Sequence, residues 1–172
     1  MVRQAWEALE VLVMHLGSQP LATELVAWVP REANQGADWL ATRALETGRD
    51  AWFWHGRWQQ FRNKEVVICS DAGVRRQGGG TLGVGLGWVM LERSTGYIVA
   101  AASWAVTPDG AAAEDVNRWE LRAALAGLGA LTFLRAGRVG EVWQGGRAAV
   151  AGEVLGAAER RKLRSLCLRA WD

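Results

Sequence analysis

The chain is predicted to fold as one α/β (α+β) domain, with a five-stranded mixed sheet and helices on both faces. Three observations predict this class. Strand-like apolar runs alternate with helix-like segments, and a glycine-broken meander of consecutive strands occupies the middle of the chain. Half of the 172 residues are apolar, which suffices for a normal core in a single domain, residues 1–172. Helices that alternate with strands favour a sheet covered on both sides.

Four segments have the periodicity or the end signals of helices: residues 2–16, 34–47, 113–134 and 147–170. In the second helix, Asn34 is a favourable N-cap and Gly48 a natural stop. Its apolar stripe consists of Ala37, Leu40, Ala41, Ala44 and Leu45. Asp38 borders this stripe, so we expect its side chain to point toward a neighbouring sheet edge.

Five strands are expected at residues 24–29, 65–71, 82–91, 97–106 and 139–143. Residues 65–71 are apolar on both faces, which favours a central position in the sheet. The hairpin 82–106 is then expected on one side of this strand, and residues 139–143 and 24–29 on the other. Residues 49–64 are rich in aromatic side chains, which flexible linkers lack, so they are expected to be a connector lying on the domain.

Composition sets mild limits on function. The net charge is only +2, but Lys64 and Lys162 are the only lysines. Arginine favours phosphate contacts and stacking, although a GC-rich coding sequence would explain the bias equally well. Cys69 and Cys167 form neither a disulfide framework nor a zinc motif, and there is no signal peptide and no membrane-spanning run. We therefore expect an intracellular protein, cytoplasmic or nuclear, without a membrane partner.

Three carboxylates lie beside apolar segments, where an ionised side chain is unfavourable unless it has a binding partner or a function. Asp71 ends an apolar strand, while Asp38 and Glu120 flank the apolar faces of helices. Carboxylates that converge without a lysine cluster usually bind a hard divalent cation. Each also has a simpler explanation: Asp71 as a strand-end residue, Asp38 as the partner of Arg43 or Arg31, and Glu120 as part of a solvated helix face.

Several motifs resemble one family. Residues 68–73 (ICSDAG), 85–89 (GLGWV) and 117–123 (NRWELRA) are similar to the first half of a ribonuclease H domain of the kind found in retroelements that encode a reverse transcriptase. Residues 29–34 (VPREAN) and 37–41 (ADWLA) resemble the last helix of that family. The resemblance spans nearly the whole chain, and its motifs are moderately specific.

The segments occur in the reverse of the family order. Residues 1–48 resemble the C-terminal segment and residues 65–172 the N-terminal segment, with residues 49–64 as the connector. A circular permutant explains this order, because family termini at the surface can be rejoined. A fragment across two tandem copies, or an open reading frame from a decayed element, would explain it too.

The resemblance implies cleavage of the RNA strand of RNA–DNA hybrids with two Mg²⁺ or Mn²⁺ ions. By position, Asp71 would bridge the metals, and Glu120 and Asp38 would each hold one. The three carboxylates should then lie within a few ångströms of one another.

Nucleic-acid binding is assigned to three further residues. Asn117 matches the position that contacts the hybrid minor groove, Gly73 would let the backbone approach the substrate, and Asn34 lies beside the last helix. The basic run 160–164 is either a phosphate-binding ridge or an ordinary solvated face. A reverse transcriptase domain in a longer polypeptide is a possible partner.

One family carboxylate is missing. Gly145 or Gly146 takes its position and offers no ligand, so one metal site should be weakened. Three functions follow from these residues: an impaired hybrid nuclease, a hybrid-binding module without catalysis, and a relic or interaction domain.

Overall fold

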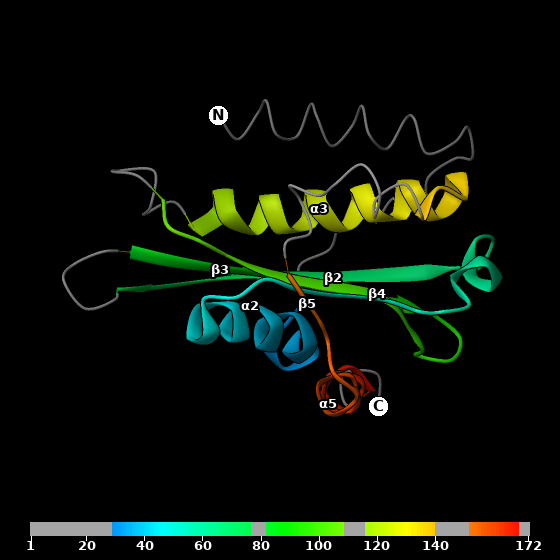
Figure 1. Cartoon of the computed structure of the whole chain (residues 1–172), viewed down its shortest axis with the longest axis horizontal. Coiled ribbons are helices and arrows are strands. Elements are labelled where there is room, and N and C mark those ends of the chain that lie inside the picture. The colour runs from blue at the N-terminus through cyan, green and yellow to red at the C-terminus, as the bar shows by residue number, and fades with distance from the viewer. Residues whose placement is uncertain (1–28, 77–81, 109–115, 140–151, 169–172) are drawn as a thin grey trace.

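The computed structural model describes residues 29–76, 82–108, 116–139 and 152–168, and their strands form one sheet with helices on both faces (Figure 1). The helices are η1 (Arg31–Ala33), α2 (Gln35–Thr47), η2 (Trp58–Phe61), α3 (Val116–Ala136) and α5 (Ala157–Leu168). The strands are β1 (Ala51–Trp54), β2 (Val66–Arg76), β3 (Leu82–Glu92), β4 (Ile98–Val106) and β5 (Glu153–Val154).

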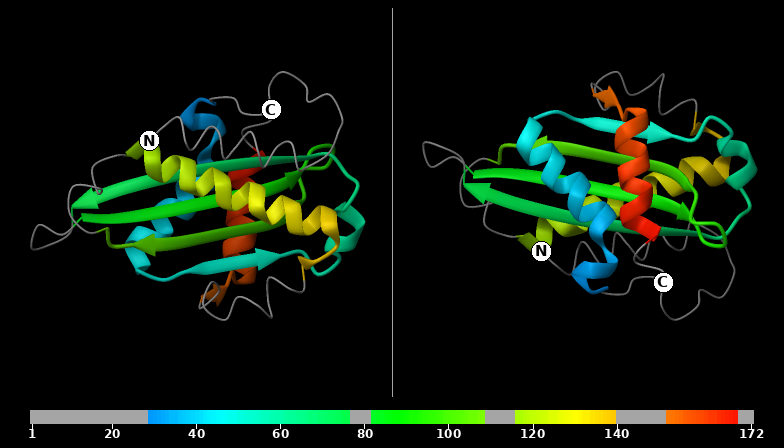
Figure 2. Two further views of the ribbon diagram at one scale, coloured as in Figure 1. Left: turned by 90° about the horizontal axis from the view of Figure 1, so that it is seen from above. Right: turned by 90° about the horizontal axis from the view of Figure 1, so that it is seen from below.

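The strand order is β2-β3-β4-β1-β5. The meander β2-β3-β4 and the pair β4-β1 are antiparallel, and β5 adds to β1 in parallel, so the predicted five-stranded mixed sheet is confirmed. Helix α3 crosses one face, while α2 and α5 cover the other, as the two opposite views in Figure 2 show. The fold class α+β with helices on both faces follows from this layering.

Two of the five strands are not the predicted ones. The segment 49–64, expected as a connector, contains β1, whose aromatic run 52–54 is typical of a strand. The predicted helix 147–170 begins only at Ala157 in the described residues, because β5 precedes it. A Cβ on Gly152 would lie 2.8 Å from the backbone of Asp50, so the glycine permits this close approach beside β1.

The predicted central position of residues 65–71 is wrong for the described sheet, in which β2 is an edge strand. Helices α2 and α3 both contact β2, and this cover on both faces accounts for its apolar character. Of the strands predicted beside it, residues 24–28 and 140–143 lie outside the described residues. Val29 is exposed and irregular, and Val139 is buried in a helical conformation. The predicted helix 2–16 also lies outside the described residues.

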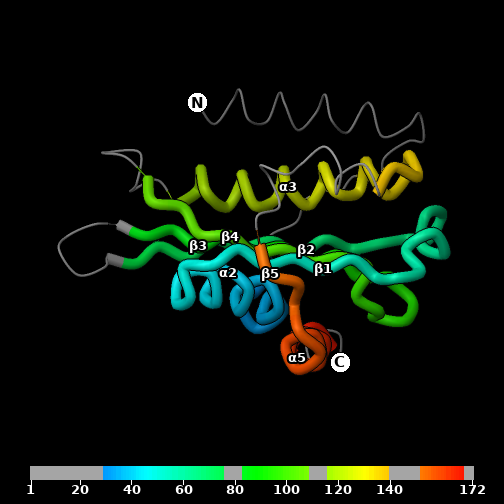
Figure 3. The backbone as a smooth tube through the Cα atoms, viewed as in Figure 1, coloured from blue at the N-terminus to red at the C-terminus, as the bar shows by residue number. Residues whose placement is uncertain are grey.

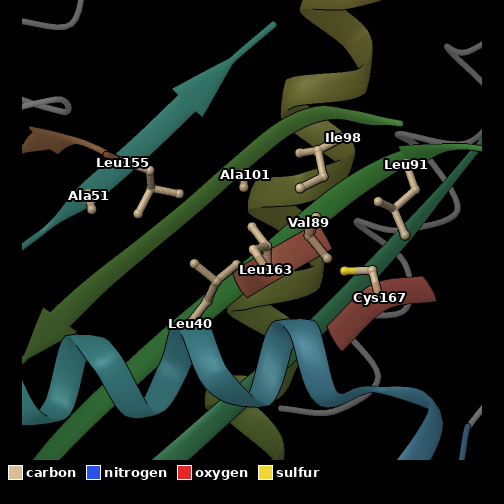
Figure 4. Packing of buried hydrophobic residues seen from close by; sticks show 9 residues of the cluster. All are labelled: Leu40, Ala51, Val89, Leu91, Ile98, Ala101, Leu155, Leu163 and Cys167. Atoms are coloured by element: carbon tan, nitrogen blue, oxygen red, sulfur yellow. The ribbon is translucent and has the colours of Figure 1, made fainter. Parts of the chain in front are cut away.

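The core has one layer on each side of the sheet, because side chains alternate along the strands. Between the sheet and helices α2 and α5, Leu40, Val89 and Leu163 pack together with the thiol of Cys167 (Figure 4). Beneath α3, Trp88 and Met90 pack against the helix and its neighbours. Figure 3 shows the same arrangement as a backbone tube, with α3 on one side of the strands and α2 and α5 on the other.

Helix α2 lies directly on β3, at two positions without side chains. A Cβ on Gly85 would come within 2.0 Å of the Ala41 carbonyl oxygen, and one on Gly87 within 2.6 Å of Leu40 Cβ. Both glycines are therefore required by the close approach of the helix. The predicted stripe of α2 is confirmed as the packed face, and Gly48 ends the helix at φ 61°.

We predict that Gly85→Ala lowers the free energy of unfolding by about 3 kcal/mol, because the backbone of α2 must move away from β3. Gly129→Ala is the matched control, since a Cβ there meets nothing within 4 Å. It should leave stability unchanged or raise it by up to about 1 kcal/mol through helix propensity. Urea unfolding measures both, and equal stability of the two variants would contradict the packing argument.

Candidate functional site

Asp71 lies on β2 with its side chain directed toward α2. Alternation along the strand puts Asp71 and Gly73 on the same face. A Cβ on Gly73 would lie 3.1 Å from Leu45 of α2, which identifies that face. Ala72, in contrast, packs with Trp119 beneath α3. Asp71 is half-buried, so its carboxylate is partly removed from water.

The start of α2 is attached to β2 beside Asp71. Asn34 Nδ2 donates a hydrogen bond of 2.9 Å to the Ser70 carbonyl, and the Ala72 amide donates one of 2.9 Å to Asp71 Oδ1. The Ser70 carbonyl and the Ala72 amide point to the same side of the strand, because backbone groups two residues apart do so. The side chains of Asn34 and Asp71 therefore supply the hydrogen bonds of both groups. Asn34 stands at the N-cap position, but the prediction that its side chain caps the helix is wrong.

The negative charges of Asp38 and Glu120 both act on Asp71. Asp38 comes from the first turn of α2 and Glu120 from the start of α3, on opposite sides of β2. Burial, together with the negative charges of Asp38 and Glu120, raises the pKa of Asp71 to about 6. The Ala72 amide and Arg31 act in the opposite direction. Asp71 is therefore the carboxylate that most needs a compensating cation.

Asp38 has a partner in the described structure. Arg31 Nη2 lies 2.9 Å from Asp38 Oδ1, with the arginine side chain 79% exposed. Arg43, the other partner considered from the sequence, is instead buried and forms a 2.6 Å ion pair with Glu159. An exposed ion pair of the Arg31 type contributes at most about 1 kcal/mol and is readily exchanged. Glu120 is exposed to solvent.

The oxygen donors suit a hard divalent cation in chemistry, but they do not form a ready metal cage. Among the described residues, no group of three His, Cys, Asp or Glu side chains could hold a metal ion as it stands. The buried Asn34 Oδ1 has no hydrogen-bond partner, so a further oxygen acceptor is available beside Ser70. Mg²⁺ takes oxygen ligands and keeps several waters, so these carboxylates are of the chemical type that it binds. Gly145 and Gly146 lie outside the described residues.

The other predicted binding residues have different surroundings. Asn117 is exposed on α3, one turn before Glu120. The missing side chain of Gly73 is explained by Leu45, which packs over it. The bond from Asn34 to Ser70 was not predicted, because nothing in the sequence pairs residues 36 positions apart.

Comparison of the whole chain with protein-family models, with curated proteins and with solved structures finds no match. Within the described ranges, no helix is both long and apolar enough to cross a membrane.

We predict that Asp71 makes the stability of the metal-free protein fall as pH rises. Its folded pKa of about 6 exceeds the ordinary value of 3.8, so between these values the folded state binds more protons than the unfolded state. Stability should fall through this window and stay lowered above it. Asp71→Asn should remove this slope and match wild type near pH 4. Thermal unfolding in EDTA tests it, and parallel profiles for both proteins would contradict it.

Proposed function

We propose that the chain is a metal-dependent nucleic-acid hydrolase of the ribonuclease H type, circularly permuted, which cleaves the RNA strand of RNA–DNA hybrids weakly. The observation that carries the proposal is that the negative charges of Asp38 and Glu120, which come from separate helices, act on the half-buried Asp71. Carboxylates are the residue type that holds the catalytic cations of phosphodiester hydrolases. The type of substrate rests on the resemblance of the motifs.

In the proposed site, Asp71 would be the shared ligand of two cations, and Asp38 and Glu120 would each hold one of them. A bound Mg²⁺ or Mn²⁺ supplies charge neutralisation at the phosphate and lowers the pKa of an attacking water. The protein groups set the starting state. Asn34 holds the start of α2 against β2, so that Asp38 stays near Asp71. Arg31 neutralises Asp38 while no cation is bound. When Asp38 binds a cation, the exposed Arg31 guanidinium can contact a phosphate oxygen instead.

The edge position of β2 departs from the sheet order that the resemblance implies, so the proposal rests on the site and not on topology. The segments expected beside β2, residues 24–28 and 140–143, lie outside the described ranges. An edge strand with a helix on each side leaves Asp71 within reach of groups from both faces of the sheet.

A second candidate function is hybrid binding without catalysis. It is favoured by the glycines at positions 145 and 146, where the family has a carboxylate, and by the lack of a preformed three-ligand group in the described residues. Both functions place the same nucleic acid on the chain and differ in turnover. A relic domain with an interaction role predicts neither binding nor cleavage.

Cleavage of a labelled RNA–DNA hybrid with Mg²⁺ or Mn²⁺ tests the proposal. Wild type should cleave slowly, and Asp71→Asn should abolish cleavage while leaving hybrid affinity within about twofold, because a neutral amide is a poor cation ligand. Glu65→Gln is the control, since it removes an equal charge from an exposed residue paired with Arg93. Equal loss of activity in both variants, or salt-insensitive hybrid binding by wild type, would refute the nuclease.

Restoring a carboxylate should strengthen the weakened metal site. Gly145→Asp or Gly146→Asp is expected to raise Mg²⁺-dependent cleavage at least about tenfold, the size of effect seen when one ligand-shell group is changed. The double variants that also carry Asp71→Asn are the controls and should stay inactive. If neither glycine variant exceeds wild type while hybrid binding persists, the binding module replaces the nuclease as the proposed function.

A further inference from the structure

A groove of about 450 Å³ lies beside the carboxylate site, between α2 and α5. Arg31 and Asp38 line it at the site end, and Trp39 and Lys162 line its wall. Asp38, one of the proposed cation ligands, lines this groove, so the groove borders the proposed site.

The groove combines an aromatic surface with cations. Lys162 Nζ lies 5.1 Å from the centroid of the half-buried Trp39 ring. Arg31 adds a second, exposed cation. Proteins that bind single-stranded nucleic acids stack bases on such aromatic side chains and track the backbone with neighbouring cations. A volume of this size falls within the range of small-ligand sites.

The rest of the lining favours a base over a bare phosphate. Glu32 and Asp38 are carboxylates in the same groove, and Gln35 offers both a donor and an acceptor. Carboxylates repel a phosphate cluster but accept hydrogen bonds from the N–H groups of bases, including N3–H of thymine. The charges of the groove are therefore mixed, which fits a nucleotide unit and not a polyphosphate.

The cations of α5 are not equivalent. Arg160 lies over Phe53 at 5.1 Å and Arg164 over Tyr97 at 4.7 Å, so both are engaged at other edges of the helix. Lys162 is the α5 cation that lines the groove, whereas Arg161 is exposed and does not line it. This difference supplies a matched pair of variants.

We propose that the groove between α2 and α5 binds a single-stranded nucleotide unit next to the cleavage site, with its base on Trp39 and its phosphate on Lys162 and Arg31. The inference rests on the nucleic-acid function proposed above and names the part of the substrate that this surface takes. In this proposal the nucleic-acid strand is single-stranded where it passes from the carboxylate site into the groove, because Trp39 offers one aromatic ring on which one base can stack.

Anisotropy of a labelled oligothymidine of about ten nucleotides, titrated in EDTA, tests the groove without any cleavage. Trp39→Ala should weaken binding about tenfold, and Trp39→Phe less than about threefold, because a smaller ring still stacks. Lys162→Gln should weaken binding and lower the salt slope by about 0.7, the value for one phosphate contact on a single strand. Arg161→Gln removes the same charge and should have less than half this effect.

Equal losses for Lys162→Gln and Arg161→Gln would overturn the groove in favour of general electrostatic attraction. So would displacement of the oligonucleotide by inorganic tripolyphosphate at matched phosphate concentration, since a phosphate site needs no base. Trp39 also packs against the core, so the thermal stability of each variant should be measured beside the titrations. If Trp39→Ala is unstable, the comparison of Lys162→Gln with Arg161→Gln tests the groove.

The two proposals fail in different ways. Asp71→Asn should retain oligonucleotide binding, so loss of cleavage with an intact Trp39 effect bears on the hydrolase alone. Unchanged oligonucleotide affinity in a folded Trp39→Ala variant and in Lys162→Gln, with hybrid cleavage retained in both, would refute the groove and leave the hydrolase standing.

Discussion

The contact of the α2 backbone with β3 sets the position of everything else on that side of the sheet. Gly85 and Gly87 present no side chains, so the helix approaches until Ala41 and Leu40 meet the strand itself. At this short separation of α2 from the sheet, the side chain of Asn34, the residue before the helix, hydrogen-bonds the Ser70 carbonyl. Asp38, one turn further on, then comes within electrostatic range of Asp71. A larger side chain on β3 would lift the helix and separate the two carboxylates.

A buried arginine fixes the second helix of this layer. Arg43 is only 8% exposed and forms ion pairs with Glu159 of α5 and Glu153 of β5. Such a pair adds little net stability, but removing its carboxylate partners would leave the buried Arg43 guanidinium uncompensated. It therefore specifies where α5 lies relative to α2. The separation of these helices in turn sets the width of the groove that contains Trp39 and Lys162.

The sequence predicted the long elements because each carries a full pattern. Helix α2 has a complete apolar stripe and a glycine stop, and α3 ends at Gly137 with φ 71°. Strands β1 and β5 were missed because four and two residues are too few to show alternation. The edge position of β2 was missed because apolar residues on both faces of a strand indicate that helices cover both faces, and they do not indicate how many strands lie beside it.

The site was predicted only in part. The grouping of Asp71, Asp38 and Glu120 came from their positions in the sequence and from motif resemblance, and it stays a prediction, although the charges of Asp38 and Glu120 act on Asp71. The roles of Asn34 and Arg31 could not be predicted, because each depends on where a helix end settles in three dimensions. An asparagine before a helix ordinarily caps it. Here the Asn34 side chain hydrogen-bonds the Ser70 carbonyl instead, because the fold places Ser70 beside it.

The side-chain bonds at Ser70 and Ala72 also affect how molecules of this protein meet one another. An exposed edge strand offers unpaired amides and carbonyls that another chain can join, which leads to aggregation. In the described sheet, Asn34 and Asp71 already occupy two such groups on β2. A strand adding there would have to displace both side chains and bury a carboxylate. The residues that build the candidate site thus also protect the protein against intermolecular β-sheet growth.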